Sequence, residues 1–172
     1  LIRASLACTL SGNWGMYNGF ELCEATPVPG KEEYLDSEKY QLRQWNRDTP
    51  GNIIEDISRL NRIRRSHAAL QSHLGIRFHE SRNEQVLYYS RHSPAGDSVV
   101  LVAVSLDPHG RQVAELDLPR WELGLADGAP VPLHDLFEDH RFTLRGAHHT
   151  IELTPERPFV LWALAADEGA AE

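Results

Sequence analysis

Apolar positions at the start of the chain gather into one short run. The run, Leu6–Leu10, is bounded by Ser11, Gly12 and Asn13 and leads into a stretch rich in glycine and aromatic residues. A short apolar run that ends at Gly and Asn is typical of a buried strand in a parallel sheet. We therefore predict a strand at Leu6–Leu10, followed by a loop at its carboxyl end, where α/β folds place ligands.

Residues 24–50 contain several prolines and many polar groups and follow no period. We predict an extended excursion here, and its length of about 25 residues exceeds the usual connection, which favours a functional role. Apolar positions then recur on one helical stripe from Ile53 and Ile57 onward. With Thr49-Pro50 as N-cap and first-turn proline, the spacing predicts a helix that continues through Ile63–His67 and ends near Leu70–Gly75.

From residue 76 on, short runs of strand-like composition alternate with turn residues. The runs that we predict as strands are Val86–Ser90, Val99–Val104, Val113–Leu118, Phe142–Leu144, Thr150–Thr154 and Phe159–Leu164. Runs at this spacing predict an antiparallel β-sandwich of seven or eight strands over residues 76–166, with a small, acidic tail at 167–172 that frays.

Charge and length exclude several classes of protein. The 172 residues carry a net charge of −8, which argues against a nucleic-acid partner, because such binding needs clustered Lys and Arg. No window approaches the roughly 18 to 20 apolar residues of a membrane span, so we expect no membrane partner and a cytoplasmic protein. The single methionine is Met16, and a complete (β/α)8 barrel needs about 250 residues, so we expect a piece of something larger.

Cysteine and histidine spacing predicts no metal chemistry. Cys8 and Cys23 fit free thiols in a protein that does not rely on disulfides. The nine histidines are scattered, and close pairs such as His148 with His149 lack the spacing that sets ligands on one face. We predict no metal site and no cofactor.

Acidic and aromatic residues in and around the excursion supply two candidate sites. The acids are Glu21, Glu24, Glu32, Glu33, Asp36 and Glu38, and the second group comprises Trp14, Tyr34, Lys39, Tyr40 and Trp45. Two carboxylates about 5 to 9 Å apart are what glycoside cleavage requires, and aromatic faces with charged groups suit a sugar subsite. The alternatives are that the acids are merely solvated and that the aromatic side chains are plain core.

Three segments carry a family resemblance: Leu6–Glu24, Glu33–Arg43 and Ile57–Leu70. They resemble the C-terminal third of the bacterial maltosyltransferases that use α-maltose-1-phosphate, in the α-amylase superfamily (glycoside hydrolase family 13). The last segment is similar to the barrel-closing helix of the whole superfamily. The run Tyr34-Leu-Asp-Ser-Glu-Lys-Tyr40 is similar to this subfamily in particular. Ala68 departs from the family, which commonly has proline there.

The resemblance implies a fold of class α/β plus all-β. Leu6–Leu10 would be the eighth strand and residues 52–68 the eighth helix of a (β/α)8 TIM barrel. Residues 1–75 would then be the end of that barrel, from strand 8 to helix 8, and the antiparallel β-sandwich would be the C-terminal domain that packs beside it.

The resemblance also implies an activity. Family members move maltosyl units from α-maltose-1-phosphate to the non-reducing end of α-1,4-glucans such as glycogen, with retention and release of phosphate. Their catalytic carboxylates precede Leu1, so no catalytic residue is assigned and the chain alone is expected to be inactive. The family's donor-binding lysine and tyrosine match Lys39 and Tyr40. Alternatively, Lys39 pairs with a carboxylate and Tyr40 packs on the barrel rim.

The implied partners are α-maltose-1-phosphate and an α-1,4-glucan, and the full-length parent is expected to be a homodimer. A second hypothesis makes the chain the barrel remnant and non-catalytic sandwich of another superfamily member, of the trehalose synthase or α-amylase type.

Overall fold

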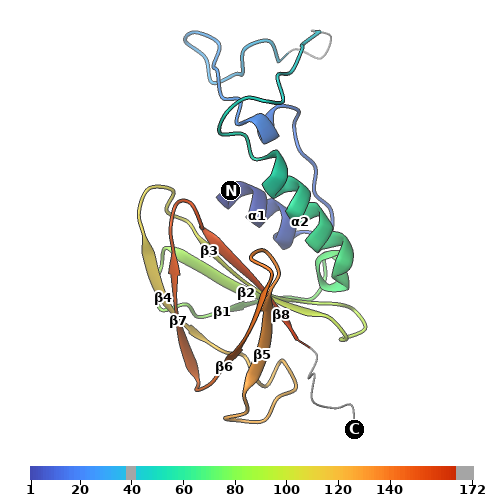
Figure 1. Cartoon of the computed structure of the whole chain (residues 1–172), viewed down its shortest axis with the longest axis vertical. Coiled ribbons are helices and arrows are strands. Elements are labelled where there is room, and N and C mark those ends of the chain that lie inside the picture. The colour runs from blue at the N-terminus through green and yellow to red at the C-terminus, as the bar shows by residue number, and fades with distance from the viewer. Residues whose placement is uncertain (38–41, 166–172) are drawn as a thin grey trace. The chain divides into compact units, whose positions relative to one another are not determined.

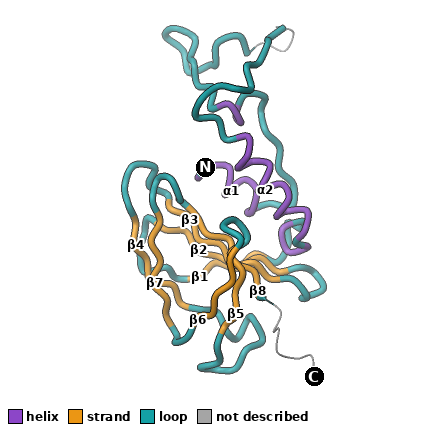
Figure 2. The backbone as a smooth tube through the Cα atoms, in the orientation of Figure 1, coloured by secondary structure: helices purple, strands orange, loops and turns teal. Residues whose placement is uncertain are grey.

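The chain divides into two compact units in the computed structural model, which describes residues 1–37 and 42–165. One unit comprises Leu1–Trp14 and the chain from Arg59 onward, and the other is Gly15–Ser58. Figure 1 labels the elements along the chain, and Figure 2 shows helices before residue 71 and strands after residue 75. The helices are α1 (Ile2–Leu10), η1 (Phe20–Leu22), α2 (Ile54–Ser66) and η2 (Ala68–Leu70).

The described part of the chain from residue 76 on forms two antiparallel sheets. The larger sheet has the order β1 (Ile76–His79), β2 (Val86–His92), β3 (Val99–Ser105), β8 (Phe159–Leu164), β5 (Val131–Asp135) and β6 (His140–Leu144). The smaller sheet pairs β4 (Gln112–Asp117) with β7 (His148–Leu153). The predicted antiparallel β structure is therefore confirmed, and every strand predicted after residue 76 is present. The sequence prediction missed β1 and β5 as individual strands.

The core lies between the inner face of the larger sheet and the smaller sheet. Alternate residues of adjacent strands supply it, such as Tyr88 from β2, Leu101 from β3 and Trp162 from β8. The smaller sheet contributes Leu116 and Leu153, both almost fully buried. Burying each such leucine contributes about 1.5–3 kcal/mol, so this layer is the main source of stability in the unit.

The outer face of the larger sheet is covered by α1 and η2, which contact β2 and β3. The Thr9 hydroxyl of α1 lies 2.6 Å from the hydroxyl of Tyr89 on β2. Burial raises the pKa of Tyr89 to about 12, so this phenol stays protonated. Since β3 is covered on both faces, its run of consecutive apolar residues is explained by two-sided burial.

Two buried arginines hold the C-terminal end of α1. Arg64 of α2 donates through Nη1 to the carbonyls of Cys8 (2.6 Å) and Ser11 (2.9 Å), and through Nη2 to the carbonyl of Gly12. Arg91 of β2 donates to the Thr9 carbonyl at 2.5 Å. The last carbonyls of a helix have no partner within it, and cations there also interact favourably with the helix dipole. These arginines therefore fasten α1 to both α2 and the sheet.

The predicted strand at Leu6–Leu10 is wrong, because these residues belong to helix α1. The helix buries a face of small residues, Ala4, Ser5, Cys8 and Thr9, which recur at helical spacing. Small side chains let the helix backbone approach the sheet closely. A short apolar run does not distinguish a buried strand from a buried helix. Because Ser5 and Thr9 on the buried face are polar, the hydrophobic pattern did not show the helical period.

The predicted helix over 52–68 is confirmed as α2, shorter at both ends. Its stripe residues Ile57 and Leu60 are buried. The predicted start at Thr49-Pro50 is wrong: the Asn52 side chain accepts the Ile54 N–H at 3.1 Å and donates to the Thr49 carbonyl, which turns the chain into the helix. Within the described residues, no helix is long and apolar enough to cross a membrane.

Candidate functional site

The unit Gly15–Ser58 holds the excursion, and part of it folds into a short hairpin. The Val28 N–H donates to the Glu33 carbonyl at 2.7 Å, the Leu35 N–H donates to the Thr26 carbonyl at 2.8 Å, and Pro27 and Tyr34 form a bridge. The hairpin thus brings Thr26 beside Leu35. Lys39 and Tyr40, the predicted donor contacts, lie outside the described residues, as does Glu38.

Arg43 ties this loop together. Its Nη2 lies 2.6 Å from Glu24 Oε2, its Nη1 donates to the Leu35 carbonyl at 3.1 Å, and its guanidinium lies 4.3 Å from the ring centroid of Trp45. Hydrogen bonds from Thr26, with a smaller effect of the Arg43 charge, lower the pKa of Glu24. Glu24 is therefore ionised at neutral pH and serves the loop's structure.

Two other acids, Glu21 and Glu33, also have local contacts. Glu21 accepts the Gly19 N–H at 3.1 Å, and Glu33 lies 3.9 Å from the ammonium of Lys31. Because Glu21, Glu24 and Glu33 each have a donor nearby, their contacts favour a structural role for these three acids.

The aromatic candidates separate into different contacts. Tyr34 stacks on Tyr17 with ring centroids 6.4 Å apart, and the Tyr17 hydroxyl donates to the Ser37 carbonyl. Trp45 lies against Gly19, where an added Cβ would fall 2.6 Å from the indole ring, so glycine is required. Trp14 belongs to the other unit and donates through Nε1 to Asn61. Among these candidates, Tyr34 with its neighbours Tyr17 and Ser37 thus forms an exposed aromatic group.

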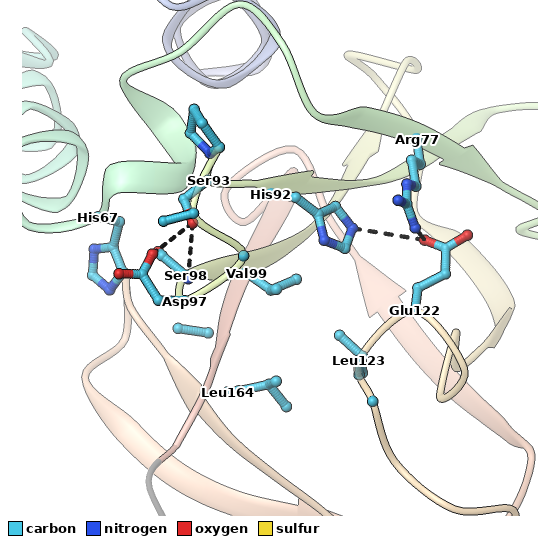
Figure 3. A pocket seen from close by; sticks show the side chains of 15 residues that line it. His67, Arg77, His92, Ser93, Asp97, Ser98, Val99, Glu122, Leu123 and Leu164 are labelled. Atoms are coloured by element: carbon cyan, nitrogen blue, oxygen red, sulfur yellow. Dashed lines mark hydrogen bonds and ion pairs between the residues drawn. The ribbon is translucent and has the colours of Figure 1, made fainter.

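A second candidate site is a cavity of about 640 Å³ in the unit that comprises Leu1–Trp14 and the chain from Arg59 onward, called the sandwich unit below. Figure 3 shows two polar groups facing one another across it, with Val99, Leu123 and Leu164 between them. Its lining residues are His67, Arg77, His92, Ser93, Pro94, Ala95, Gly96, Asp97, Ser98, Val99, Glu122, Leu123, Gly124, Ala163 and Leu164. Small-molecule sites typically have about 300–1,000 Å³, so this cavity has the size of a ligand site.

One polar group is centred on Ser90 and Glu122. The Ser90 hydroxyl lies 2.8 Å from His79 Nε2 and 2.9 Å from His92 Nε2. Glu122 Oε2 lies 3.7 Å from each of these nitrogens and 3.4 Å from Arg77 Nη1. A serine hydroxyl has one proton to donate, so at least one histidine donates its Nε2–H to Ser90.

Burial keeps both histidines of this group neutral. Desolvation lowers the pKa of His79 and of His92, with the positive charge of Arg77 adding to the effect and Glu122 opposing it. The network therefore carries one ion pair, between Arg77 and Glu122, and two neutral imidazoles at pH 7. Ser90 is fully buried and so cannot attack a substrate; it holds the surrounding side chains in place.

Sequence reasoning missed this group, although a signal existed. Arg77 and Ser90 are paired across β1 and β2, and His79 and His92 each follow two residues later on the same face. On β1 the polar Arg77 and His79 alternate with the apolar Ile76 and Phe78, and this period of two marks such a face. The register that brings the two strands together was not predictable from the spacing alone.

The described residues contain no group of three or more His, Cys, Asp or Glu side chains that could hold a metal ion. Cys8 and Cys23 are both free thiols. Burial raises the pKa of Cys8 to about 11, so its thiol is unreactive near neutral pH.

Comparison with known proteins gives consistent matches. A family model described as "GLGE, C-terminal" matches residues 78–161. An α-1,4-glucan:maltose-1-phosphate maltosyltransferase of Cereibacter sphaeroides is 48% identical over 96% of this chain and 25% of its own length. The Pseudomonas aeruginosa enzyme of that name is 51% identical over 94% of this chain and 24% of its own length. The chain thus spans about a quarter of these relatives.

Solved structures show the fold that the chain shares. A maltogenic α-amylase from Thermotoga neapolitana matches 95% of this chain and 36% of its own, with a TM-score of 0.62 and 18% identity. The protein AmyP in complex with maltose matches 98% of this chain and 34% of its own, also with a TM-score of 0.62, at 16% identity. The antiparallel β structure described above therefore resembles the C-terminal domain of α-amylase-like proteins.

Proposed function

Since this chain belongs to the family of α-1,4-glucan:maltose-1-phosphate maltosyltransferases, we propose that it is the C-terminal part of such an enzyme. The whole enzyme would transfer maltosyl units from α-maltose-1-phosphate to the non-reducing end of α-1,4-glucans, including glycogen, and release phosphate. The observation that carries the proposal is an identity of 48–51% to maltosyltransferases along nearly the whole chain. We expect the enzyme to be cytoplasmic and homodimeric, as the resemblance implies.

The order of elements supports a place at the end of a barrel. Helix α1 is followed by a segment without regular structure, residues 13–17, and then by α2 after the excursion. A (β/α)8 barrel alternates helix and strand, so α1 and α2 would be its last two helices. The last barrel strand would then fall between them, after α1 rather than at Leu6–Leu10.

In this enzyme the double displacement would be carried out by residues outside this chain. An aspartate would attack the anomeric carbon, and a glutamate would protonate the departing phosphate and later deprotonate the acceptor hydroxyl. This chain would contribute Lys39 and Tyr40 to the donor site. An ammonium donates to several sugar hydroxyls, and a tyrosine offers a ring face and a hydroxyl.

The loop described above supports that assignment on both sides of residues 38–41. Ser37 is held through its carbonyl by the Tyr17 hydroxyl, and Arg43 is held by Glu24 and the Leu35 carbonyl. A binding segment needs such fixed ends, because ordering a free loop on binding would weaken affinity.

The test is phosphate release from α-maltose-1-phosphate with glycogen as acceptor, measured on the full-length parent enzyme. We expect release by the parent and a loss of at least about a hundredfold in kcat/KM, about 2.7 kcal/mol, for Lys39→Ala and for Tyr40→Ala. Lys31→Ala, which changes another exposed lysine of the same unit, is the control and should keep full activity.

A second candidate function follows from the α-amylase-like fold. In this candidate the chain belongs to an enzyme that hydrolyses α-glucans, since two α-amylase structures match it over 95–98% of its length. Maltose formation from starch by the parent enzyme, without phosphate release from α-maltose-1-phosphate, would favour this candidate over the transferase.

A further inference from the structure

We propose that the cavity beside Glu122, together with Trp121, is a non-catalytic α-glucan-binding site of the sandwich unit. It would hold a glucan chain at a place separate from the donor contacts Lys39 and Tyr40. The identity of the ligand rests on the proposed function, whereas the chemistry of the site rests on the contacts below.

The cavity has the mixed character that a sugar ring requires. The Ser90–Glu122 group lies on one side, and on the other side the Ser93 hydroxyl donates to Asp97 Oδ1 at 2.7 Å and accepts the Ser98 N–H at 3.1 Å. Figure 3 shows Val99 and Leu164 between the two sides. A pyranose has hydroxyls around its edge and C–H groups on its faces, so it can contact polar walls and an apolar floor at once.

The charges of the lining favour a neutral ligand. Arg77 is already paired with Glu122, and Asp97 is held by Ser93. An anion would face these two carboxylates, and a cation would face Arg77. A polyhydroxyl ligand can instead donate to the carboxylates and accept from the guanidinium without an uncompensated charge.

Trp121, which lies next to the lining residues and is not one of them, would supply the aromatic face that a glucan site needs. It is 91% exposed and directly precedes Glu122, on the loop whose residues Glu122–Gly124 line the cavity. Tryptophan side chains are mostly buried in folded proteins, so an exposed one is unusual. Because Trp121 is 91% exposed, its indole ring is accessible to a ligand. A sugar can stack its C–H face on that ring.

The turn that carries Trp121 is firmly held. The Gly124 N–H donates to the Trp121 carbonyl at 3.2 Å, and the Leu125 N–H donates to the Arg120 carbonyl at 2.9 Å. The buried Arg120 side chain donates to the Ala129 carbonyl at 3.1 Å and to the Gly146 carbonyl. Because the turn is fixed, binding would require little ordering of the loop.

The experiment is native gel electrophoresis of the 172-residue chain in gels with and without glycogen, with maltoheptaose as competitor. We expect glycogen to slow the chain and maltoheptaose to reverse the effect. Trp121→Ala should weaken the affinity about tenfold, since it removes the stacking surface without touching the core. Glu122→Gln, with folding checked by circular dichroism, should weaken it as well.

Matched controls show whether the retardation depends on Trp121 in particular. Val113→Ala alters an exposed apolar residue of β4 and should leave the retardation unchanged. The double variant Lys39→Ala/Tyr40→Ala should also be retarded like the parent chain. The proposal would be overturned if glycogen did not slow the unsubstituted 172-residue chain, or if it slowed Trp121→Ala equally.

Failure of this site and failure of the proposed function give different experimental results. If the full-length enzyme releases no phosphate but glycogen still slows the chain through Trp121, the transferase assignment fails and the site stands. If phosphate is released and Trp121→Ala binds glycogen normally, the site fails and the transferase stands.

Discussion

Each of the two compact units is stabilised internally by a different kind of interaction. The sandwich unit buries a continuous apolar layer between sheets whose strands are far apart in sequence, such as β3 with β8. The unit Gly15–Ser58 has few buried residues and is held by short-range hydrogen bonds and by Arg43. Stability therefore resides in the sandwich, whereas the loop has an ordered surface that a few polar contacts maintain. Loops that carry binding residues are commonly built this way.

The largest effect is expected from opening the sandwich core. Leu116 is fully buried, so Leu116→Ala should lower the free energy of unfolding by about 2–5 kcal/mol through lost burial and the cavity left behind. Urea unfolding followed by circular dichroism measures this. Tyr34→Ala in the loop unit should change it by less than about 0.5 kcal/mol. Equal effects would contradict the contrast between the units.

A smaller loss is expected where α1 is fastened. Arg64→Met should lower the free energy of unfolding by about 2–3 kcal/mol, because it leaves buried carbonyls at the end of α1 without donors. Hydrogen exchange should show the amides of α1 losing protection first. Arg64→Lys keeps the charge but not the planar fork, and should recover only part of the loss. Unchanged protection of α1 in Arg64→Met would show that the helix is held by packing alone.

The histidines of the Ser90 group should make the sandwich sensitive to acid. Burial lowers the pKa of His79 and His92 below 6.5 in the folded state, so the unfolded chain takes up more protons as the pH falls. The contribution of His79 and His92 to the free energy of unfolding is complete above pH 6.5. It is lost as the pH falls from 6.5 through their lowered pKa values in the folded state. Unfolding measured from about pH 8 to about pH 5 should show this loss.

The double variant His79→Gln/His92→Gln should be less stable at about pH 8 but should lose less stability on acidification. His109→Gln, in an exposed turn, should keep the parent's pH dependence. A double variant with the same pH slope as the parent chain would assign the acid sensitivity to other groups, such as His149, whose pKa burial also lowers.

The smallest effect on stability is expected in the loop. Arg43→Ala removes the ion pair with Glu24 and the contact with Leu35, and should change the free energy of unfolding by no more than about 1 kcal/mol. It should nevertheless speed cleavage of Gly15–Ser58 by chymotrypsin under native conditions. Arg47→Ala in the same unit is the matched control. No change in cleavage would mean that Arg43 does not order the loop.

Much of the fold followed from local patterns. Helix α2 was predictable because its apolar residues recur on one stripe, and the strands because short β-branched runs alternate with turn residues. Helix α1 was not, because its buried face consists of Ala4, Ser5, Cys8 and Thr9, which carry almost no hydrophobic signal. Their burial depends on partners such as Tyr89, eighty residues away in the chain.

The candidate sites likewise divide into one that the sequence indicated and one that depends on contacts between distant residues. The resemblance pointed to the excursion and to Lys39 and Tyr40, but spacing did not show which distant segments meet at the cavity beside Glu122. Its side chains come from β1, β2, β3 and β8, from the turn between β2 and β3, and from the loop that holds Trp121. Each residue by itself is ordinary in the sequence, and only their convergence gives them a role.

Helix α2, most of the strands and the family resemblance were thus predictable from the residues themselves, because periodicity and motif depend on neighbours within a few positions. Tertiary structure alone decided that residues 2–10 are a helix and that Ser90 meets two histidines and Glu122. Both outcomes depend on strand register and on packing across tens of residues. A hydrophobic pattern specifies which face is buried, but not what that face will meet.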